Sequence, residues 1–202
     1  ALLAEAGIAR SQLDAVAVSR GPGAFTGVRL AIALVQGIAL ALDRPVVARS
    51  TLEVLAMRAQ ATPGTHVLAA IDARMGEVYS QAFVYDADNL CALGAARVSA
   101  PDAVELPGDA AAWSGVGTGF SAVDGALQSR LRARFAWIDA TALPHAADLA
   151  QIAAAAFARG EAIAPERVEP AYLRDNVALT LVEQIALRAS RRAAEPGTPD
   201  TV

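Results

Sequence analysis

Histidine is the first residue type to consider, because a neutral imidazole is a common metal ligand and general base in proteins. The sequence holds two histidines, His66 and His145, which are far apart along the chain. A helical metal clamp needs two histidines four residues apart on one face. His66 is expected to start a strand and His145 to precede a helix, so neither belongs to a ligand pattern. We expect no metal site at either residue.

The other reactive residue types narrow the chemistry further. All 17 basic residues are arginine, so no lysine can hold a phosphate, form a Schiff base or act as a general base. The single cysteine, Cys91, excludes an internal disulfide and is expected to be a small buried apolar residue. Asp72 and Glu77 flank a predicted hairpin turn and could be paired carboxylates. The favoured interpretation is that one of them is an acid at a strand end and the other is solvated. We predict no catalytic residue and no cofactor.

Two glycine-rich segments are candidates for binding an anion. Gly21-Pro-Gly-Ala-Phe-Thr-Gly27 lies between a predicted strand and a predicted helix, where backbone N–H groups can meet a phosphate. Phe25 and the absence of lysine favour a structural turn instead. Gly115-Val-Gly-Thr-Gly119 follows a strand but lacks the Rossmann spacing, so it is interpreted as a tight turn that could face a cleft. Which residues would bind a cofactor stays unknown.

Hydrophobic spacing and turn residues predict the elements that position these groups. Strands are expected at 15–19, 45–49, 66–74, 77–85, 95–98, 111–116 and 135–139. Helices are expected at 27–42, 51 to about 60, 121–133, 146–159 and 179–192, after the last turns of a helix at 1–6. Ser50, with Glu53 three residues later, is a capping box that would start the second of these helices.

The order of these elements predicts an α/β fold with two lobes. Residues 1–64 would form the first lobe and residues 65–165 the second. A returning C-terminal segment and helix would follow at 166–192, and a disordered tail at 193–202.

The composition suggests a chain that pairs with another protein. Hydrophobic residues make up 54% and charged residues 19% of the chain, and such an apolar excess suggests surface that a partner buries. The net charge of −4 gives no basic surface for binding nucleic acid alone, although Arg130, Arg132 and Arg134 form a local cluster. The longest apolar run, 30–42, is shorter than the about 20 residues of a membrane span. We expect a cytoplasmic protein without membrane contact.

The predicted helix at 27–42 is apolar nearly all round, so it should be buried on more than one side. One side is an aliphatic stripe suited to a sheet, formed by Val28, Ile32, Val35 and Leu42. Another side mixes small and polar residues and is the predicted partner interface, formed by Arg29, Ala33, Gln36, Gly37 and Leu40. The alternative is ordinary packing on the remnant helix at 1–7 of the same lobe, and both contacts could hold together.

Three separated segments resemble one protein family. Gly21-Pro-Gly-Ala-Phe-Thr-Gly-Val-Arg29, Ile71-Asp-Ala-Arg-Met-Gly-Glu-Val-Tyr79 and Pro170-Ala-Tyr-Leu-Arg174 are similar to segments of the TsaB (YeaZ) family, in the same order. This family is a non-catalytic homologue of TsaD and of glycopeptidase-like proteins. The resemblance implies an actin-like, Hsp70-like (ASKHA) two-lobed fold and a role beside TsaD, which transfers threonylcarbamate to an adenosine adjoining the anticodon.

Two departures from the family and its relatives bear on function. Family members begin with a strand that carries a phosphate-contacting motif and continues into a hairpin, and this sequence lacks both. The first lobe is therefore expected to lack its N-terminal strands. TsaD-like relatives bind a metal with two histidines four residues apart, whereas the similar positions here are Thr51 and Leu55. The resemblance thus implies that the metal site is absent.

The sequence as a whole favours a scaffold subunit that has no catalysis of its own. It would pair with a TsaD-like catalytic subunit, helped by a TsaE-like ATPase, in modifying tRNAs that read codons beginning with A. Contact with tRNA is expected only within the complex, and a homodimer is expected when the chain is alone. Two alternatives stay open: an actin-like ATPase, kinase or glycopeptidase-like enzyme, and an independent homodimeric binding protein.

Overall fold

The computed structural model describes residues 2–59, 62–86, 89–110 and 112–174. The predicted helix at 179–192 and the tail at 193–202 lie outside these residues. The helices are α1 (Leu2–Glu5), α2 (Phe25–Leu42), α3 (Thr51–Ala56), α4 (Ala122–Leu131) and α5 (Ala146–Ala158). The strands are β1 (Val16–Ser19), β2 (Val46–Arg49), β3 (His66–Arg74), β4 (Glu77–Asp86), β5 (Asn89–Ala92), β6 (Arg97–Ser99), β7 (Trp113–Val116) and β8 (Phe135–Asp139).

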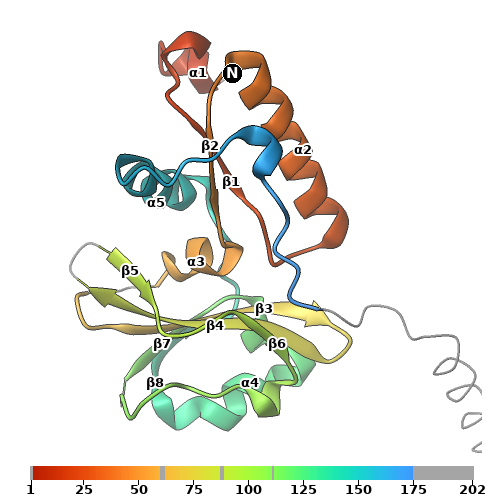
Figure 1. Ribbon diagram of the computed structural model, residues 1–202. Coiled ribbons are helices and arrows are strands. Elements are labelled where there is room, and N and C mark those ends of the chain that lie inside the picture. Colours follow the sequence, from red (N-terminus) through yellow and green to blue (C-terminus); the bar gives the residue numbers. More distant parts are fainter. Residues whose placement is uncertain (1, 60–61, 87–88, 111, 175–202) are drawn as a thin grey trace, which may run out of the picture.

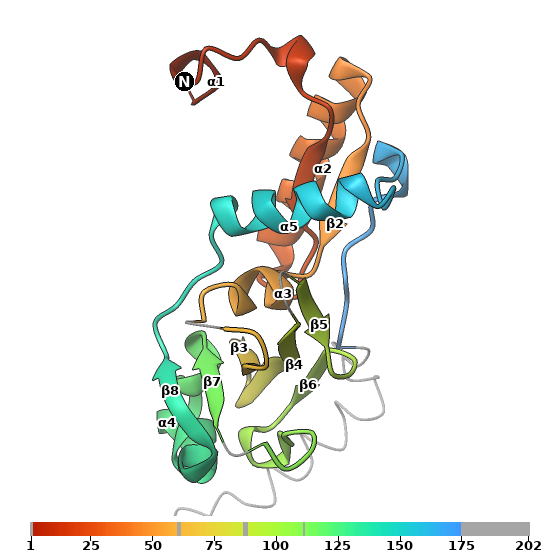
Figure 2. The same cartoon turned by 90° about the vertical axis from the view of Figure 1, so that its left-hand side faces the viewer.

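The first sheet consists of β1 and β2, which run parallel. Figures 1 and 2 show this sheet between α2 and α5. Successive side chains of a strand point to opposite faces. Val46 accordingly packs with Ile32 of α2, whereas the next residue, Val47, packs with Ala153 of α5. Both faces of this small sheet are thus covered by helices.

The second sheet is larger and mixed, in the order β5-β4-β3-β7-β8, with β6 also pairing with β4. β3 and β4 form an antiparallel hairpin, whereas β3, β7 and β8 run parallel. The hairpin turn contains Arg74, Met75 and Gly76, all with positive φ, and glycine adopts this backbone conformation without strain. The hairpin predicted from Met75 and Gly76 is therefore confirmed.

Helices cover both faces of the second sheet (Figures 1 and 2). Val67 packs with Leu55 of α3 on the face that looks toward the first sheet. Leu68, the next residue of β3, packs with Leu127 of α4 on the opposite face. All four side chains are fully or almost fully buried, so α3 is fixed by the core of the second sheet. α3 thereby joins the two halves of the molecule.

A C-terminal segment, residues 163–174, runs from the first sheet to the second, and we name it the strap. It begins with an antiparallel bridge to Val46. The backbone N–H of Ala171 then donates to the carbonyl of Arg20 at 2.8 Å. The strap ends at the β3–β4 hairpin, where Arg174 forms an ion pair with Glu77. In Figure 1 it descends beside α2 toward β3.

Most predicted elements are confirmed, and most of their ends differ by no more than two residues. β5 was missed, and the helix predicted from residue 51 to about 60 ends at Ala56. The predicted capping box is wrong in one half. Ser50 does accept a hydrogen bond from the backbone N–H of Leu52, but the Glu53 carboxylate pairs with Arg49. The mixed α/β class is confirmed.

The division of the chain into lobes stays a prediction. The sequence placed residues 65–165 together, yet α5 packs on β1 and β2 rather than on the second sheet. The small side chains of Ala153 and Ala156 explain this contact, because they let α5 approach Val47 closely. We propose that α5 belongs with the first lobe.

Candidate partner interface

α2 begins within the glycine-rich segment, at Phe25, and ends at Leu42, with Asp43 as the capping residue. Asp43 adopts the left-handed conformation, with φ at 51°, and its N–H bonds back to the last turn of the helix. This is an ordinary helix stop, although asparagine or glycine is commoner there. The loop fixes the start of α2 beside the strap, since a Cβ on Gly21 would lie 3.2 Å from the carbonyl oxygen of Ala171. This tight packing favours the interpretation of the loop as a structural turn.

One side of α2 is buried against the first sheet, as predicted for Val28, Ile32 and Val35, whereas Leu42 is half-buried and lies outside this core. Ile32 is 5% exposed, and Val28 and Val35 pack around it in the same cluster. Ala39 extends this side by one turn and is completely buried. The spacing of these residues is that of one helix face.

The opposite side of α2 is open in the described structure. Leu30, Leu34 and Ile38 are 58%, 58% and 49% exposed. Leu40, from the predicted interface, is 61% exposed. An exposed stripe of large aliphatic side chains is unusual on a monomer and is typical of interaction surfaces. Leu30, Leu34 and Ile38 were not predicted as surface residues, although their four-residue spacing identifies one face of a helix.

The five residues of the predicted interface divide into two groups. Ala33, Gly37 and Leu40 are exposed, and a Cβ on Gly37 would meet nothing within 4 Å. This side therefore does not pack within the described part of its own chain. Arg29 and Gln36 have partners in the strap, so the proposed role of fixing a partner's register stays a prediction for them.

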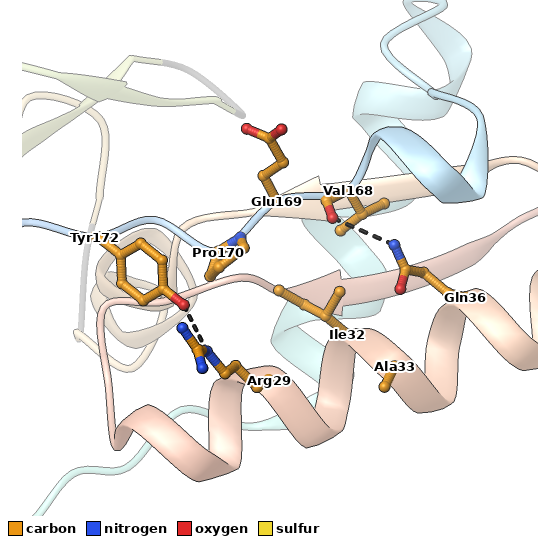
Figure 3. A pocket seen from close by; sticks show the side chains of 8 residues that line it. All are labelled: Arg29, Ile32, Ala33, Gln36, Val168, Glu169, Pro170 and Tyr172. Atoms are coloured by element: carbon orange, nitrogen blue, oxygen red, sulfur yellow. Dashed lines mark hydrogen bonds between the residues drawn. The ribbon is translucent and has the colours of Figure 1, made fainter.

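Figure 3 shows how Arg29 and Gln36 meet the strap. The Nε–H of Arg29 donates to the hydroxyl of Tyr172 at 2.7 Å. The side-chain amide of Gln36 donates to the carbonyl of Pro165 at 3.0 Å and to that of Val168 at 3.4 Å. Between α2 and the strap lies a shallow groove of about 490 Å³, with Ala33 on its helix side.

A second and larger cavity, of about 820 Å³, lies where the first half of the molecule meets the β3–β4 hairpin. We name it the cleft. It is lined by Pro22, Gly23, Ala24, Phe25, Val28, Arg29, Ile71, Asp72, Ala73, Arg74, Tyr79, Thr118, Ala171, Tyr172, Leu173 and Arg174. The three segments used for the family resemblance all contribute to it, together with Thr118.

The second glycine segment is a tight turn, and one of its residues faces the cleft. Gly117 has φ at 109°, and a Cβ there would collide with the carbonyl oxygen of Ala70. A Cβ on Gly119 would lie 2.7 Å from the Cβ of Ala70. The hydroxyl of Thr118 accepts a hydrogen bond from the backbone N–H of Asp72 at 3.2 Å. These glycines are therefore required by close packing.

The acidic candidates have structural partners. Asp72 pairs with Arg74 at 3.2 Å, and its carboxylate also accepts the backbone N–H of Arg74 at 2.8 Å. Glu77 pairs with Arg174 of the strap, so the interpretation of this acid as merely solvated is corrected. The two carboxylates are thus balanced by separate arginines rather than paired with each other.

The histidines also have structural neighbours. The imidazole of His145 accepts the backbone N–H of Ala147 at 3.4 Å, at the start of α5. The ring of His66 lies 5.0 Å from that of Trp113. The expectation of a buried Cys91 is wrong: the thiol belongs to the short edge strand β5 and is exposed.

Thr51 and Leu55 also have structural contacts. The hydroxyl of Thr51 shares a 2.7 Å hydrogen bond with that of Ser19, and Leu55 is completely buried in the core under α3. Within the residues that the structure describes, no three histidine, cysteine, aspartate or glutamate side chains gather as a metal site would need.

Two arginines of the predicted cluster bind the chain itself. Arg130 donates to the carbonyls of Pro101 and Val104, and Arg134 donates to that of Ala110 at 3.0 Å. These bonds anchor the loop between β6 and β7. Arg132 is exposed.

Among the described residues, α2 alone has the length and composition of a membrane span, with 18 residues and a mean hydropathy of 1.8. Only 11% of it is buried, which reflects the open aliphatic side. The core helix of a soluble protein can have the same length and hydropathy. The expectation of no membrane contact stays a prediction.

Two α/β halves around a cleft, with helices on both faces of each sheet, define an actin-like two-lobed protein. A family model described as "TsaD: tRNA N6-adenosine threonylcarbamoyltransferase" matches residues 1–181. The tRNA threonylcarbamoyladenosine biosynthesis protein TsaB of Escherichia coli is 40% identical over 185 residues, which are 88% of this chain and 78% of that protein. The protein of the same name in Haemophilus influenzae is 33% identical and is covered over 76% of its length.

Solved structures agree with these relatives. YeaZ from Pseudomonas aeruginosa is 44% identical, with a TM-score of 0.73, over 85% of this chain and 79% of that one. A Pseudomonas aeruginosa protein described as similar to the peptidase YEAZ is 48% identical, with a TM-score of 0.78, over 86% of this chain and 79% of that one. The chain belongs to the TsaB (YeaZ) family and has its actin-like ASKHA fold.

Proposed function

We infer that this chain is the partner subunit of a TsaD-like catalyst in the synthesis of threonylcarbamoyladenosine in tRNA. Membership of the TsaB family supports this role, because curated relatives carry the name of that pathway. The match to the TsaD family model supports a partner of related fold. In a symmetric homodimer the same surface patch of each subunit forms the interface, and a partner of related fold could offer a similar patch.

The observation that carries the proposal is the open aliphatic side of α2. Leu30, Leu34 and Ile38 form a stripe with a four-residue spacing, and Leu40 lies beside them. Ala33 and Gly37 sit between these side chains and would let a partner helix approach closely. Burying apolar surface gains about 25 cal/mol per Å², so covering this stripe favours association. We assign the partner interface to this side of α2, with Arg29 and Gln36 at its edge against the strap.

The subunit is proposed to be non-catalytic. Thr51 supplies a hydroxyl and Leu55 an alkyl group where TsaD-like relatives have metal-binding histidines. A peptidase is the alternative that the description of one solved relative raises. Such an enzyme would need an activated nucleophile or a metal-bound water. Asp72 and His145 are both engaged in hydrogen bonds with neighbouring backbone.

The remaining parts of the proposal concern the assembly. A TsaE-like ATPase would join the complex, and tRNA would be bound only there, because the chain's net charge is −4. Alone, the chain would form a homodimer through the same side of α2. We place this assembly in the cytoplasm.

Size-exclusion chromatography with light scattering, on the chain mixed with the TsaD-like protein from the same genome, tests the proposal. A complex of one chain of each kind, or of two of each, is expected. The same chain mixed with an unrelated actin-like protein is the control. Two species that elute separately with unchanged masses would contradict the assignment of the partner.

A further inference from the structure

The cleft has a lining that suits a ligand rather than solvent alone. Its volume of about 820 Å³ falls in the range of small-molecule pockets, which often lie between domains. Phe25 and Tyr172 line it, and both residues are more than half exposed, at 59% and 52%. Tyr79 and Ile71 of the hairpin add further apolar surface. A planar apolar group would cover these rings.

The charge of the lining is the second observation. Arg29, Arg74 and Arg174 line the cleft, whereas Asp72 is the acid among its lining residues. Arg74 is balanced by Asp72, and Arg174 by Glu77. Arg29 has no carboxylate partner within the described part of the chain. A positive cleft contrasts with the net charge of −4 of the whole chain.

The position of Arg29 makes its charge available. Its guanidinium carbon lies 3.8 Å from the centre of the Phe25 ring and 5.6 Å from that of Tyr172. The Nε–H donates to the Tyr172 hydroxyl, which holds the plane of the group. The terminal Nη atoms make no hydrogen bond to the residues described. Such a fixed guanidinium can donate two parallel hydrogen bonds to a carboxylate, sulfonate or phosphate.

We propose that the cleft is a binding site for a small molecule that carries a planar apolar group and one anionic group. The planar group lies against Phe25 and Tyr172, and the anion meets the Nη atoms of Arg29. This site shares Arg29 with the edge of the proposed partner interface, whereas its other walls come from the hairpin and the strap.

Fluorescence titration with two probes tests the proposal. Anilinonaphthalene sulfonate carries a planar naphthalene ring and an anionic sulfonate, and phenylnaphthylamine has the same rings without the charge. The full chain should bind the anionic probe saturably at one site and more tightly than the neutral one. Arg29→Gln should weaken the anionic probe at least about tenfold, since a charge-assisted contact is lost, and leave the neutral probe unchanged. Phe25→Ala should weaken both probes.

Two variants control for other binding surfaces. Arg132→Gln removes an exposed arginine far from the cleft, and Leu34→Gln alters the open side of α2. Both should bind the probes as the unaltered chain does. Thermal melting of every variant verifies that it is folded. Equal affinity for the two probes, an effect of Leu34→Gln as large as that of Arg29→Gln, or binding that never saturates would each overturn the proposal.

Discussion

Arg29 and Tyr172, 143 positions apart in the sequence, are joined by a 2.7 Å hydrogen bond from the Arg29 Nε–H to the Tyr172 hydroxyl. This bond attaches the strap to the first turns of α2, and two residues later Arg174 pairs with Glu77 of the hairpin. The strap therefore connects the proposed partner interface with the second sheet. It also forms one wall of the cleft.

Gln36 should contribute to stability through the strap. Gln36→Met keeps the side-chain length but leaves the carbonyls of Pro165 and Val168 without this donor. We expect a loss of about 1 kcal/mol in the free energy of unfolding, the usual cost of a partly buried hydrogen bond. Thermal or urea denaturation measures it, with Gln151→Met on the exposed side of α5 as the matched control. Identical losses in the two variants would show that the strap does not depend on Gln36.

Ala33→Arg should separate association from stability. Ala33 is exposed, so an arginine there should change the free energy of unfolding by no more than about 0.5 kcal/mol. In a close helix contact the same side chain costs about 1–3 kcal/mol, and more where its charge is buried without a partner. Light scattering with the TsaD-like subunit should therefore show at least a tenfold weaker complex, which corresponds to about 1.4 kcal/mol.

The matched control for this variant is Ala154→Arg, an exposed alanine on α5. It should leave both melting and association unchanged. A collapsed melting temperature for Ala33→Arg would instead favour packing of this side inside the chain's own lobe. Normal association would remove α2 from the interface.

Gly117 should not tolerate a side chain. Its φ of 109° and the carbonyl oxygen of Ala70 in the path of a Cβ predict that Gly117→Ala costs about 3 kcal/mol or more. Gly108 also has positive φ, at 68°, but nothing lies within 4 Å of its Cβ position. Gly108→Ala should therefore cost only about 1 kcal/mol. Urea denaturation measures the loss in the free energy of unfolding for both variants. Gly117→Ala suffers backbone strain and a collision with Ala70, whereas Gly108→Ala suffers backbone strain alone. Equal losses would refute the close approach at Gly117.

Asp139 should titrate at lower pH than an ordinary aspartate. Hydrogen bonds from the side chain and the backbone N–H of Thr141 stabilise its carboxylate and lower its pKa from the usual 3.8. A folded-state pKa below the unfolded one stabilises the protein above the unfolded pKa, and this contribution is lost as the pH falls through the folded pKa. Thr141→Val should therefore raise the pKa of Asp139 and lower the melting temperature at neutral pH more than in acid.

Carboxyl NMR titration measures this pKa directly. Thr141→Ser keeps the hydroxyl donor and should leave the pKa low. A pKa of Asp139 that is ordinary in the unaltered chain, or unchanged in Thr141→Val, would contradict the role of Thr141.

Local patterns sufficed for elements that carry a clear turn signal or a regular helical spacing. β3 and β4 were predicted as two strands joined by a Met75–Gly76 turn, and both are present. The buried side of α2 followed from its helical spacing in the same way. β5, an edge strand of four residues, was not predicted.

Contacts that depend on the surrounding fold were beyond such patterns. Glu53 matched a capping box by spacing, but its carboxylate pairs instead with the charged guanidinium of Arg49 on the preceding strand. Arg29 and Gln36 were assigned to a partner surface because nothing local shows that the strap returns beside α2. The cleft likewise depends on three segments that only the fold brings together.

Formation of threonylcarbamoyladenosine in tRNA is the measurement that tests the proposed role most directly. The TsaD-like subunit, the pathway ATPase, unmodified tRNA and a threonylcarbamate donor are incubated with and without this chain, and the modified nucleoside is quantified by mass spectrometry. We expect product only when this chain and the TsaD-like subunit are both present. Ala33→Arg should abolish most of it, whereas Ala154→Arg should not. Product formed by this chain without the TsaD-like subunit, or an equal yield when the chain is omitted, would contradict its role as a non-catalytic partner.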